Sequence, residues 1–203
     1  MSKKISIAID AMGGDNAPDK TIEGIKLFLD KNKSTNDFIL NIFGKENIIK
    51  EKLDKYNIKS NFINIIHSNT VVSDEETPLT AVKNSKNTSM WNCIKSQLDG
   101  HSDISLSAGN TGVLLVISRM ILKMMEKVSK PALAGLWPNK NGMNVVLDLG
   151  ANIDCDENNL VELSSPTGTD SKEFGKSALK HLIGVATYNY SQKKSLTRGN
   201  NFS

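Results

Sequence analysis

The stretch Ile5-Ser-Ile-Ala-Ile-Asp-Ala-Met-Gly-Gly-Asp-Asn-Ala-Pro18 decides the fold of this chain. Its apolar first part predicts a strand over residues 4–9. The pair Gly13-Gly14 predicts a tight turn, because glycine adopts backbone angles that other residues avoid. Pro18 suits the first turn of a helix, where its missing N–H donor would have no partner anyway. A strand that turns directly into a helix is typical of α/β proteins.

The rest of the chain repeats this alternation. The helix expected after Pro18 carries its apolar face on Ile22, Ile25, Phe28 and Leu29. Further strands are predicted at residues 38–43, 62–66, 104–106, 133–136 and 143–147. Further helices are predicted at residues 46–56, from residue 78 to about 98, and from residue 111 onwards. The alternation predicts a largely parallel sheet with helices on both faces, so the fold class is α/β.

The composition excludes several classes of protein. The 203 residues include 25 Lys and Arg against 22 Asp and Glu, and the arginines are Arg119 and Arg198 alone. Because nucleic-acid binders concentrate positive charge and use arginine for forked contacts, we expect no nucleic-acid partner. The longest apolar stretch, residues 113–125, contains Ser118, Arg119 and Lys123. It is therefore too interrupted for a membrane span, which needs about 20 apolar residues.

The first residues and the cysteines indicate a cytoplasmic protein. Met1-Ser-Lys-Lys leads into the first strand with no apolar signal region. Cys93 and Cys155 lie far apart and form no metal-ligand spacing, which predicts two reduced thiols and no metal site. Cys155 is better explained as a buried thiol than as an acylated nucleophile, because no histidine lies near it in the sequence.

Three strand ends share one chemistry. The loops at residues 10–18, 107–112 and 148–154 are rich in Gly, Asp and Asn. In a parallel sheet such loops lie at the carboxyl edge, where ligands meet helix N-termini. Taken singly, each loop is equally well explained as a capped turn, but the three together predict a site for a small anion. The chain has no GxGxxG and no GxxxxGK[ST] motif, so the dinucleotide fingerprint and the P-loop are absent.

Residues 10–18 resemble the opening motif of the bacterial phosphate acyltransferases, the acyl-carrier-protein:phosphate acyltransferases of phospholipid synthesis. Residues 78–90, 107–112, 130–133 and 146–154 are similar to further motifs of that family, in the same order. The resemblance covers residues 1–160, which we expect to form one α/β domain. It implies a fold related to the isocitrate and isopropylmalate dehydrogenases, incomplete here at its C-terminus.

The resemblance also implies a reaction and its partners. In the family, inorganic phosphate attacks the thioester of a fatty acyl group on acyl carrier protein, which gives an acyl phosphate and free carrier. The family is homodimeric and either soluble or peripheral to the membrane. Phosphate is already a nucleophile and a thioester is already activated, so we expect no cofactor and no metal.

The expected site combines residues of all three loops. We expect catalytic roles for Asp10, Asn110, Asp148 and Asn152: the amides would stabilise an oxyanion, and the carboxylates would orient donors or handle a proton. Lys83 and Lys86 would attract the anion. The other substrate-binding residues are expected to be Gly13, Gly14, Asp15, Ser107, Gly109, Thr111, Gly112 and Gly150.

Residues 161–203 depart from the family pattern and are expected to form a divergent or truncated tail. Their last part, residues 188–203, is polar and rich in Lys, Ser and Asn. An inactive anion-binding fragment of such an enzyme therefore stays open beside the acyltransferase. A phosphotransferase or nucleotide-binding protein is a third alternative, which the missing P-loop disfavours.

Overall fold

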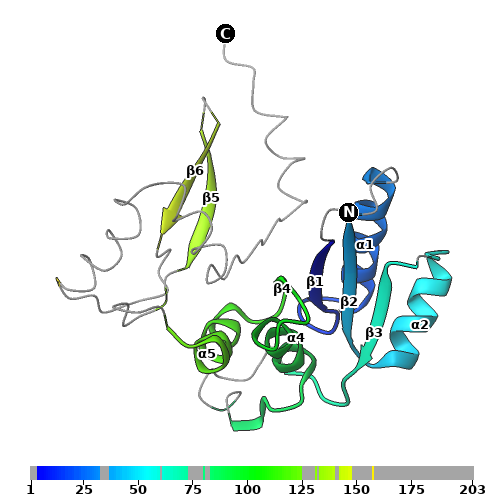
Figure 1. The fold of residues 1–203 in the computed structure, drawn as a ribbon, viewed down its shortest axis with the longest axis horizontal. Coiled ribbons are helices and arrows are strands. Elements are labelled where there is room, and N and C mark those ends of the chain that lie inside the picture. Colours follow the sequence, from blue (N-terminus) through cyan, green and yellow to red (C-terminus); the bar gives the residue numbers. More distant parts are fainter. Residues whose placement is uncertain are drawn as a thin grey trace.

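A computed structural model describes residues 4–32, 37–59, 61–72, 80, 83–124, 131, 133–139, 142–147 and 157. The first four elements are β1 (Ile5–Asp10), α1 (Asp19–Lys31), β2 (Phe38–Gly44) and α2 (Glu46–Lys55). They are followed by β3 (Ile63–His67), α4 (Ser89–Leu98), β4 (Ile104–Ser107), α5 (Thr111–Leu122), β5 (Ala134–Asn139) and β6 (Gly142–Leu147). The strands and helices alternate through β1 to α5, as Figure 1 shows, so the predicted α/β class is confirmed.

Four of the strands form one parallel sheet in the order β3-β2-β1-β4. The strand β1 lies inside this sheet, between β2 and β4. In its register, Asp10 pairs with Phe43 of β2 on one side and with Ser107 of β4 on the other. The last residue of β1 therefore lies in the same row as the last residue of β4, at the carboxyl edge of the sheet.

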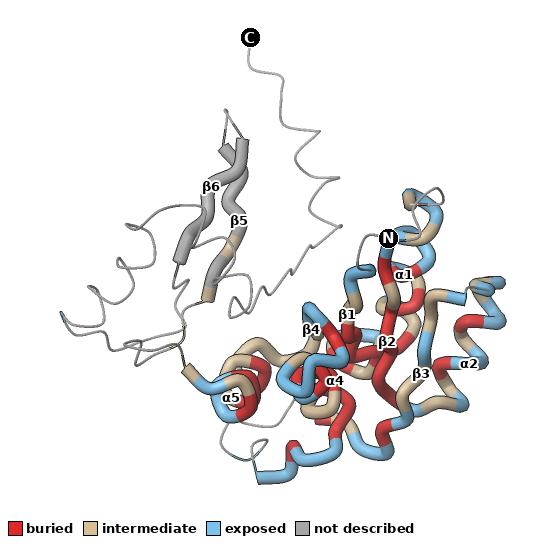
Figure 2. Tube along the Cα trace, viewed as in Figure 1, coloured by how far each residue is buried: buried red, intermediate tan, exposed pale blue. Residues whose placement is uncertain are grey.

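Alternate residues of the strands build two cores, because successive side chains of a strand point to opposite faces. On one face, Ile9 of β1 and Leu40 of β2 pack against the helices α1 and α2 through Ile22 and Ile49. On the other face, Ala8 and Phe43 pack against Cys93 of α4. Figure 2 shows the buried residues concentrated along β1 and β2 and on the helix sides that face them.

The helices α4 and α5 form a third core with each other. Its buried residues are Val72, Met90, Ile94, Val113, Leu114, Ile117 and Ile121. The helix α5, which is apolar over most of its sequence, thus buries one side against α4, while Met120 on its other side is 49% exposed. Among the described residues, no helix combines the length and the apolar character that crossing a bilayer requires.

The helix predicted from residue 78 to about 98 is interrupted: Thr80, Lys83 and Asn84 are helical, but α4 begins only at Ser89. The chain turns at Lys86 and Asn87, and Asn87 has a left-handed backbone with a φ of 67°. Thr88 then caps the helix: its Oγ1 accepts a hydrogen bond from the Trp91 amide at 3.2 Å. A capping threonine favours a helix start at this point, because its side chain accepts a hydrogen bond from an amide of the first turn that would otherwise need a carbonyl of a preceding turn.

The strands β5 and β6 pair with each other and form a separate two-stranded antiparallel sheet. Residues 133–136 and 143–147 were expected to be strands, and strands are found there, but they do not extend the parallel sheet. Two residues separate β5 from β6, which leaves room for a hairpin and not for the crossover that a parallel pair needs. The expected tail at residues 161–203 lies outside the described residues.

Candidate functional site

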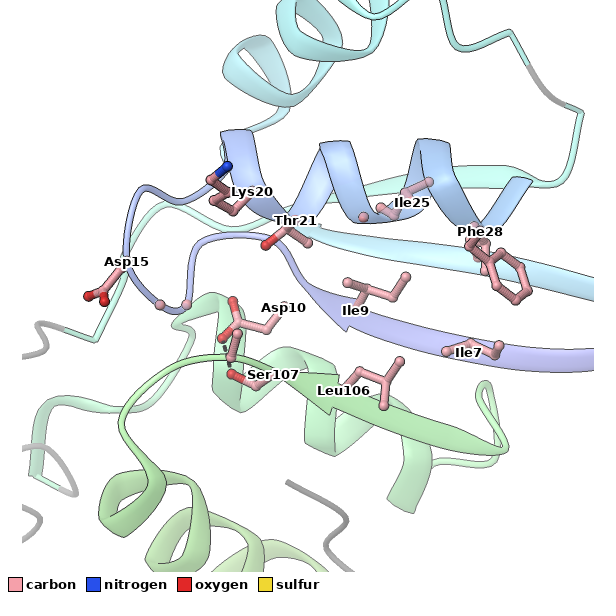
Figure 3. A pocket seen from close by; sticks show the side chains of 15 residues that line it. Ile7, Ile9, Asp10, Asp15, Lys20, Thr21, Ile25, Phe28, Leu106 and Ser107 are labelled. Carbon is pink, nitrogen blue, oxygen red and sulfur yellow. Dashed lines mark hydrogen bonds between the residues drawn. The ribbon is translucent and has the colours of Figure 1, made fainter. Parts of the chain in front are cut away.

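The carboxylate of Asp10 joins the first two predicted loops. The Ser107 hydroxyl donates a hydrogen bond to Asp10 Oδ2 at 2.7 Å, and the Met12 amide donates one to Asp10 Oδ1 at 3.2 Å. Figure 3 shows the two side chains meeting at the ends of their strands. Asp10 is only 2% exposed, so this carboxylate anchors the loops from inside the protein.

Two opposing effects act on the pKa of Asp10. Burial is the larger effect and raises the pKa of the carboxyl group above its ordinary value, because a charge is costly to remove from water. The nearby Ser89 hydroxyl and hydrogen bonds from Ser107 and the amides of Met12 and Gly13 lower the pKa, and they only partly offset the burial. The outcome is a carboxyl group that holds its proton to a higher pH than an exposed aspartate does.

Ser89, the first residue of α4, is a functional candidate that was not among the predicted site residues, although it lies within the family-like motif at residues 78–90. It is 1% exposed, and among the described residues its hydroxyl is the buried side-chain group without a hydrogen bond of good geometry. It lies close enough to Asp10 to lower the pKa of the carboxyl group, yet the two do not meet as donor and acceptor at proper distance and angle. The Ser89 hydroxyl is therefore a buried polar group beside Asp10 that could turn to either the carboxylate or a ligand. The hydroxyl pair formed by Thr88 and Ser89 within that motif is the signal that could have identified it.

Close backbone approach explains the glycines of these loops. A Cβ atom on Gly13 would lie 2.6 Å from Asp10 Oδ2 and 2.9 Å from the Gly109 amide nitrogen. A Cβ atom on Gly14, whose φ is +93°, would lie 2.5 Å from the Ala108 carbonyl oxygen. Real side chains essentially never come so close, so the loops after β1 and β4 can only pack together in this way if both positions are glycine.

Two helices begin beside this junction. Asn110 caps α5, and its Oδ1 accepts a hydrogen bond from the Val113 amide at 3.1 Å. The Gly109 amide donates to Ser107 Oγ at 3.2 Å, which holds the loop before α5 in place. The side chain of Met90, in the first turn of α4, lies against Gly109. The positive ends of two helix dipoles therefore face the same edge of the sheet, an arrangement that favours an anion.

The structure brings together part of the predicted site. Asp10, Gly13, Gly14, Ser107 and Gly109 lie in one cluster. Asn110 joins this cluster through the loop before α5, and Thr111 and Gly112 form the first turn of that helix. Asp15 is exposed, and it lies at the rim of a cavity that opens between α1 and the strands β1 and β4.

The other predicted site residues are not part of this cluster. Lys83 and Lys86 are exposed on the segment that precedes α4, and they do not line the cavity. Asp148, Gly150 and Asn152 lie outside the described residues.

A cavity of about 410 Å³ opens beside the cluster, between α1 and the strands β1 and β4. Its size falls in the usual range for small-molecule sites. Polar groups lie at the loop end, where Asp15, Lys20 and Thr21 join the two loops. Lys20 and Thr21 were not predicted as site residues, because a lysine and a threonine near a helix start carry no specific sequence signal.

The fold and the cavity define a class: α/β proteins with a cavity that opens at the carboxyl edge of a parallel sheet, where proteins of this architecture bind their ligands. Residues 5–174 match the model of the family described as "Fatty acid synthesis protein", and the chain belongs to that family. The family match and the relatives below confirm the resemblance to the phosphate acyltransferases.

Curated relatives of this chain are named "Phosphate acyltransferase", and two of them illustrate the similarity. The one from Pelagibacter ubique (strain HTCC1062) is 51% identical over 166 residues, which are 81% of this chain and 48% of the relative. The one from Azorhizobium caulinodans is 37% identical over 165 residues, which are 81% of this chain and 46% of the relative. The chain thus spans about half the length of the curated relatives that it matches.

A solved structure supports the fold. The EutD phosphotransacetylase from Staphylococcus aureus superposes with a TM-score of 0.55 and 15% sequence identity, over 85% of this chain and 54% of that one. At this identity the similarity shows the fold alone.

Proposed function

We propose that this chain carries the N-terminal part of an acyltransferase that moves a fatty acyl group from acyl carrier protein to inorganic phosphate. The family and the names of its relatives support this proposal. The observation that carries it is the junction of Asp10 and Ser107, where two glycine-lined loops and two helix N-termini converge. Such a junction suits a phosphate dianion, which needs backbone amides and positive helix ends.

The reaction needs little from the protein beyond placement. A phosphate oxygen attacks the carbonyl carbon of the thioester and forms the new C–O bond. The tetrahedral oxyanion then collapses, the C–S bond breaks, and the carrier thiolate leaves and takes up a proton. The protein must hold the dianion beside the carbonyl and stabilise the oxyanion, which preorganised amides do well.

The individual roles follow from position. The first-turn amides of α5, from Thr111 and Gly112, would bind phosphate or the oxyanion together with the Asn110 side chain. Asp10 would orient the two loops rather than touch the substrate, because its oxygens already accept hydrogen bonds from Ser107 and Met12. The exposed Lys83 and Lys86 would raise the local concentration of anions.

Several further expectations belong to this proposal. Asp148, Gly150 and Asn152 would complete the site from the third loop. The domain would comprise residues 1–160, followed by a divergent tail at residues 161–203. The enzyme would work in the cytoplasm as a homodimer that associates peripherally with the membrane.

A second candidate function is a non-catalytic anion-binding protein. It is favoured by one observation: the Asp10 carboxylate at the centre of the cluster already accepts hydrogen bonds from Ser107 and Met12, as a group that only holds the loops together would. The described site would then bind phosphate without transferring an acyl group.

One assay separates the two candidates. The purified chain is incubated with acyl-loaded carrier protein, with and without inorganic phosphate, and any acyl phosphate is trapped with hydroxylamine as the hydroxamate. Phosphate-dependent hydroxamate supports the acyltransferase, while phosphate binding without hydroxamate supports the binding protein. Lys50→Ala serves as a control, because Lys50 forms an exposed ion pair with Glu46 on α2, outside the site. Failure to bind phosphate at all would contradict both candidates.

A further inference from the structure

The cavity beside the site is polar at one end and apolar along the rest of its length. Its polar end is formed by the two loops, at Gly13, Gly14 and Ser107. From there it runs back along β1 and β4, over Ile7, Ile9 and Leu106. In Figure 3 these side chains face Ile25 and Phe28 of α1 across the space. A ligand that fills it must therefore have a polar head and an apolar tail.

In the described part of the chain, the arrangement of β1, β4 and α1 leaves this groove open. The helix α1 packs over β1 and β2, and α4 packs against the opposite face of the sheet. On the α1 side, β4 carries Leu106 in the same row as Ile9, and Leu106 is 39% exposed. Phe28, across the groove, is 37% exposed. Leu106 thus lines the groove on the sheet side and Phe28 lines it on the helix side, and no other side chain among the described residues covers either of them completely.

Gly24 keeps the groove wide. It lines the cavity from α1, and a Cβ atom placed on it would meet no other atom within 4 Å. Thr21, Gly24 and Phe28 lie on one face of the helix, because residues three and seven positions apart share a face. A glycine inside a helix weakens it relative to alanine. Glycine at this position therefore costs some helix stability but leaves the space beside it open. A larger side chain there would enter the groove without a clash.

We propose that this groove binds the alkyl chain of the acyl group, with Gly24 as a residue that determines how long a chain fits. The proposal rests on the proposed function for its head group: the carbonyl and the phosphate would lie at the loop end, and the chain would extend along β1 towards Ile7. Burial of methylene groups against Ile9, Leu106 and Phe28 would supply the binding energy. The loop amides would fix which end of the ligand enters the site.

Alkyl phosphates of increasing length test this directly. Butyl, hexyl and octyl phosphate and inorganic phosphate are titrated into the 203-residue chain by calorimetry. Each buried methylene should tighten binding by up to about fourfold, from ~0.8 kcal/mol per group. Octyl phosphate should therefore bind at least tenfold more tightly than butyl phosphate. Inorganic phosphate should bind most weakly, because it contacts only the polar end of the cavity.

Two variants locate the effect. Gly24→Leu places a branched side chain in the groove and should weaken octyl phosphate at least tenfold while leaving inorganic phosphate unchanged. Lys31→Leu is the matched control, because it adds the same side chain at an exposed position of α1 that does not line the cavity. Circular dichroism and thermal melts confirm that both variants fold.

The outcomes separate this proposal from the proposed function. Equal affinity for butyl and octyl phosphate, or equal effects of the two leucine variants, would overturn the groove while phosphate binding still stood. Octyl phosphate binding that is sensitive to Gly24→Leu, without any binding of inorganic phosphate, would support the groove and contradict the proposed function. Affinity for octyl phosphate that falls as protein concentration rises would show that a second copy covers the groove, which also overturns the proposal.

Discussion

The Ser107 hydroxyl donates to Asp10 Oδ2 at 2.7 Å across 97 positions of the sequence, and this bond joins the ends of two neighbouring parallel strands. The bond fixes the loop after β1 against the loop after β4. The candidate site therefore depends on a buried carboxylate that holds the two loops together by hydrogen bonds.

Asp10→Ala should destabilise the protein. The substitution leaves the Ser107 hydroxyl and the Met12 amide without their acceptor, and each unpaired buried donor costs about 1–3 kcal/mol. Asp10→Asn keeps one acceptor oxygen and should lose less. Urea unfolding measures the free energies, with Asp54→Ala, an exposed position on α2, as the control. Equal stability of Asp10→Ala and Asp54→Ala would show that Asp10 does not hold the loops.

Removing the charge of Asp10 should also change how stability depends on pH. Because the folded pKa is raised above the ordinary value of 3.8, the folded state binds the proton more tightly than the unfolded state does. Stability therefore falls as pH rises from about 3.8 through the raised folded pKa, and it levels off above it. Asp10→Asn lacks this titration. The stability advantage of the unsubstituted protein over this variant, measured as the difference between their free energies of unfolding, should therefore decrease as the pH rises through this range. A difference that increases with pH would contradict the raised pKa.

Gly14→Ala should cost more stability than Gly100→Ala. Both glycines have a left-handed backbone, with φ values of +93° and +75°. At Gly100 the added Cβ meets open space, so only the backbone strain of about 1–2 kcal/mol applies. At Gly14 the Cβ would also lie 2.5 Å from the Ala108 carbonyl oxygen, which must move. Thermal melts compare the two variants, and equal losses would show that the two loops do not pack as described.

Asn110 has a structural and a proposed catalytic role that substitutions can separate. Its oxygen caps α5, so Asn110→Ala should lower stability by about 1 kcal/mol. If its amide also stabilises the oxyanion, Asn110→Ala should lower phosphate-dependent acyl transfer by ~100-fold. Asn110→Asp keeps a capping oxygen but loses the NH2 donor, so it should retain stability and lose turnover. Normal turnover in Asn110→Asp would leave Asn110 as a helix cap alone.

The periodic parts of the fold could be predicted from the sequence. The apolar runs at β1, β2 and β3 and the amphipathic pattern of α1 and α2 depend on neighbours in the chain, and they were placed within a residue or two. The break between the helical residues Lys83 and Asn84 and the start of α4 was missed, because the turn and the Thr88 cap interrupt a pattern that reads as one continuous helix. The antiparallel pairing of β5 with β6 was missed because apolar runs do not report strand direction.

The candidate site was predicted in its residue types more than in its geometry. The three loops follow from the rule that ligands bind at strand ends. The neighbour relation of β1 and β4, by contrast, is a property of the whole sheet, and so are the Asp10–Ser107 bond and the groove beside Gly24. An exposed glycine in a helix gives no sequence signal that it lines a cavity.

The interior place of β1 in the sheet has a consequence for biosynthesis. The strand β1 leaves the ribosome before both of its neighbours, so it receives β2 on one side and must keep its other side available until β4 has been made. At roughly 5–20 residues per second, the 97 positions from Asp10 to Ser107 take about 5–20 seconds to translate. During that interval Asp10 lacks its partner Ser107, and the edge of β1 that later pairs with β4 is unpaired. A chaperone that covers this edge would be most useful to the nascent chain at this stage.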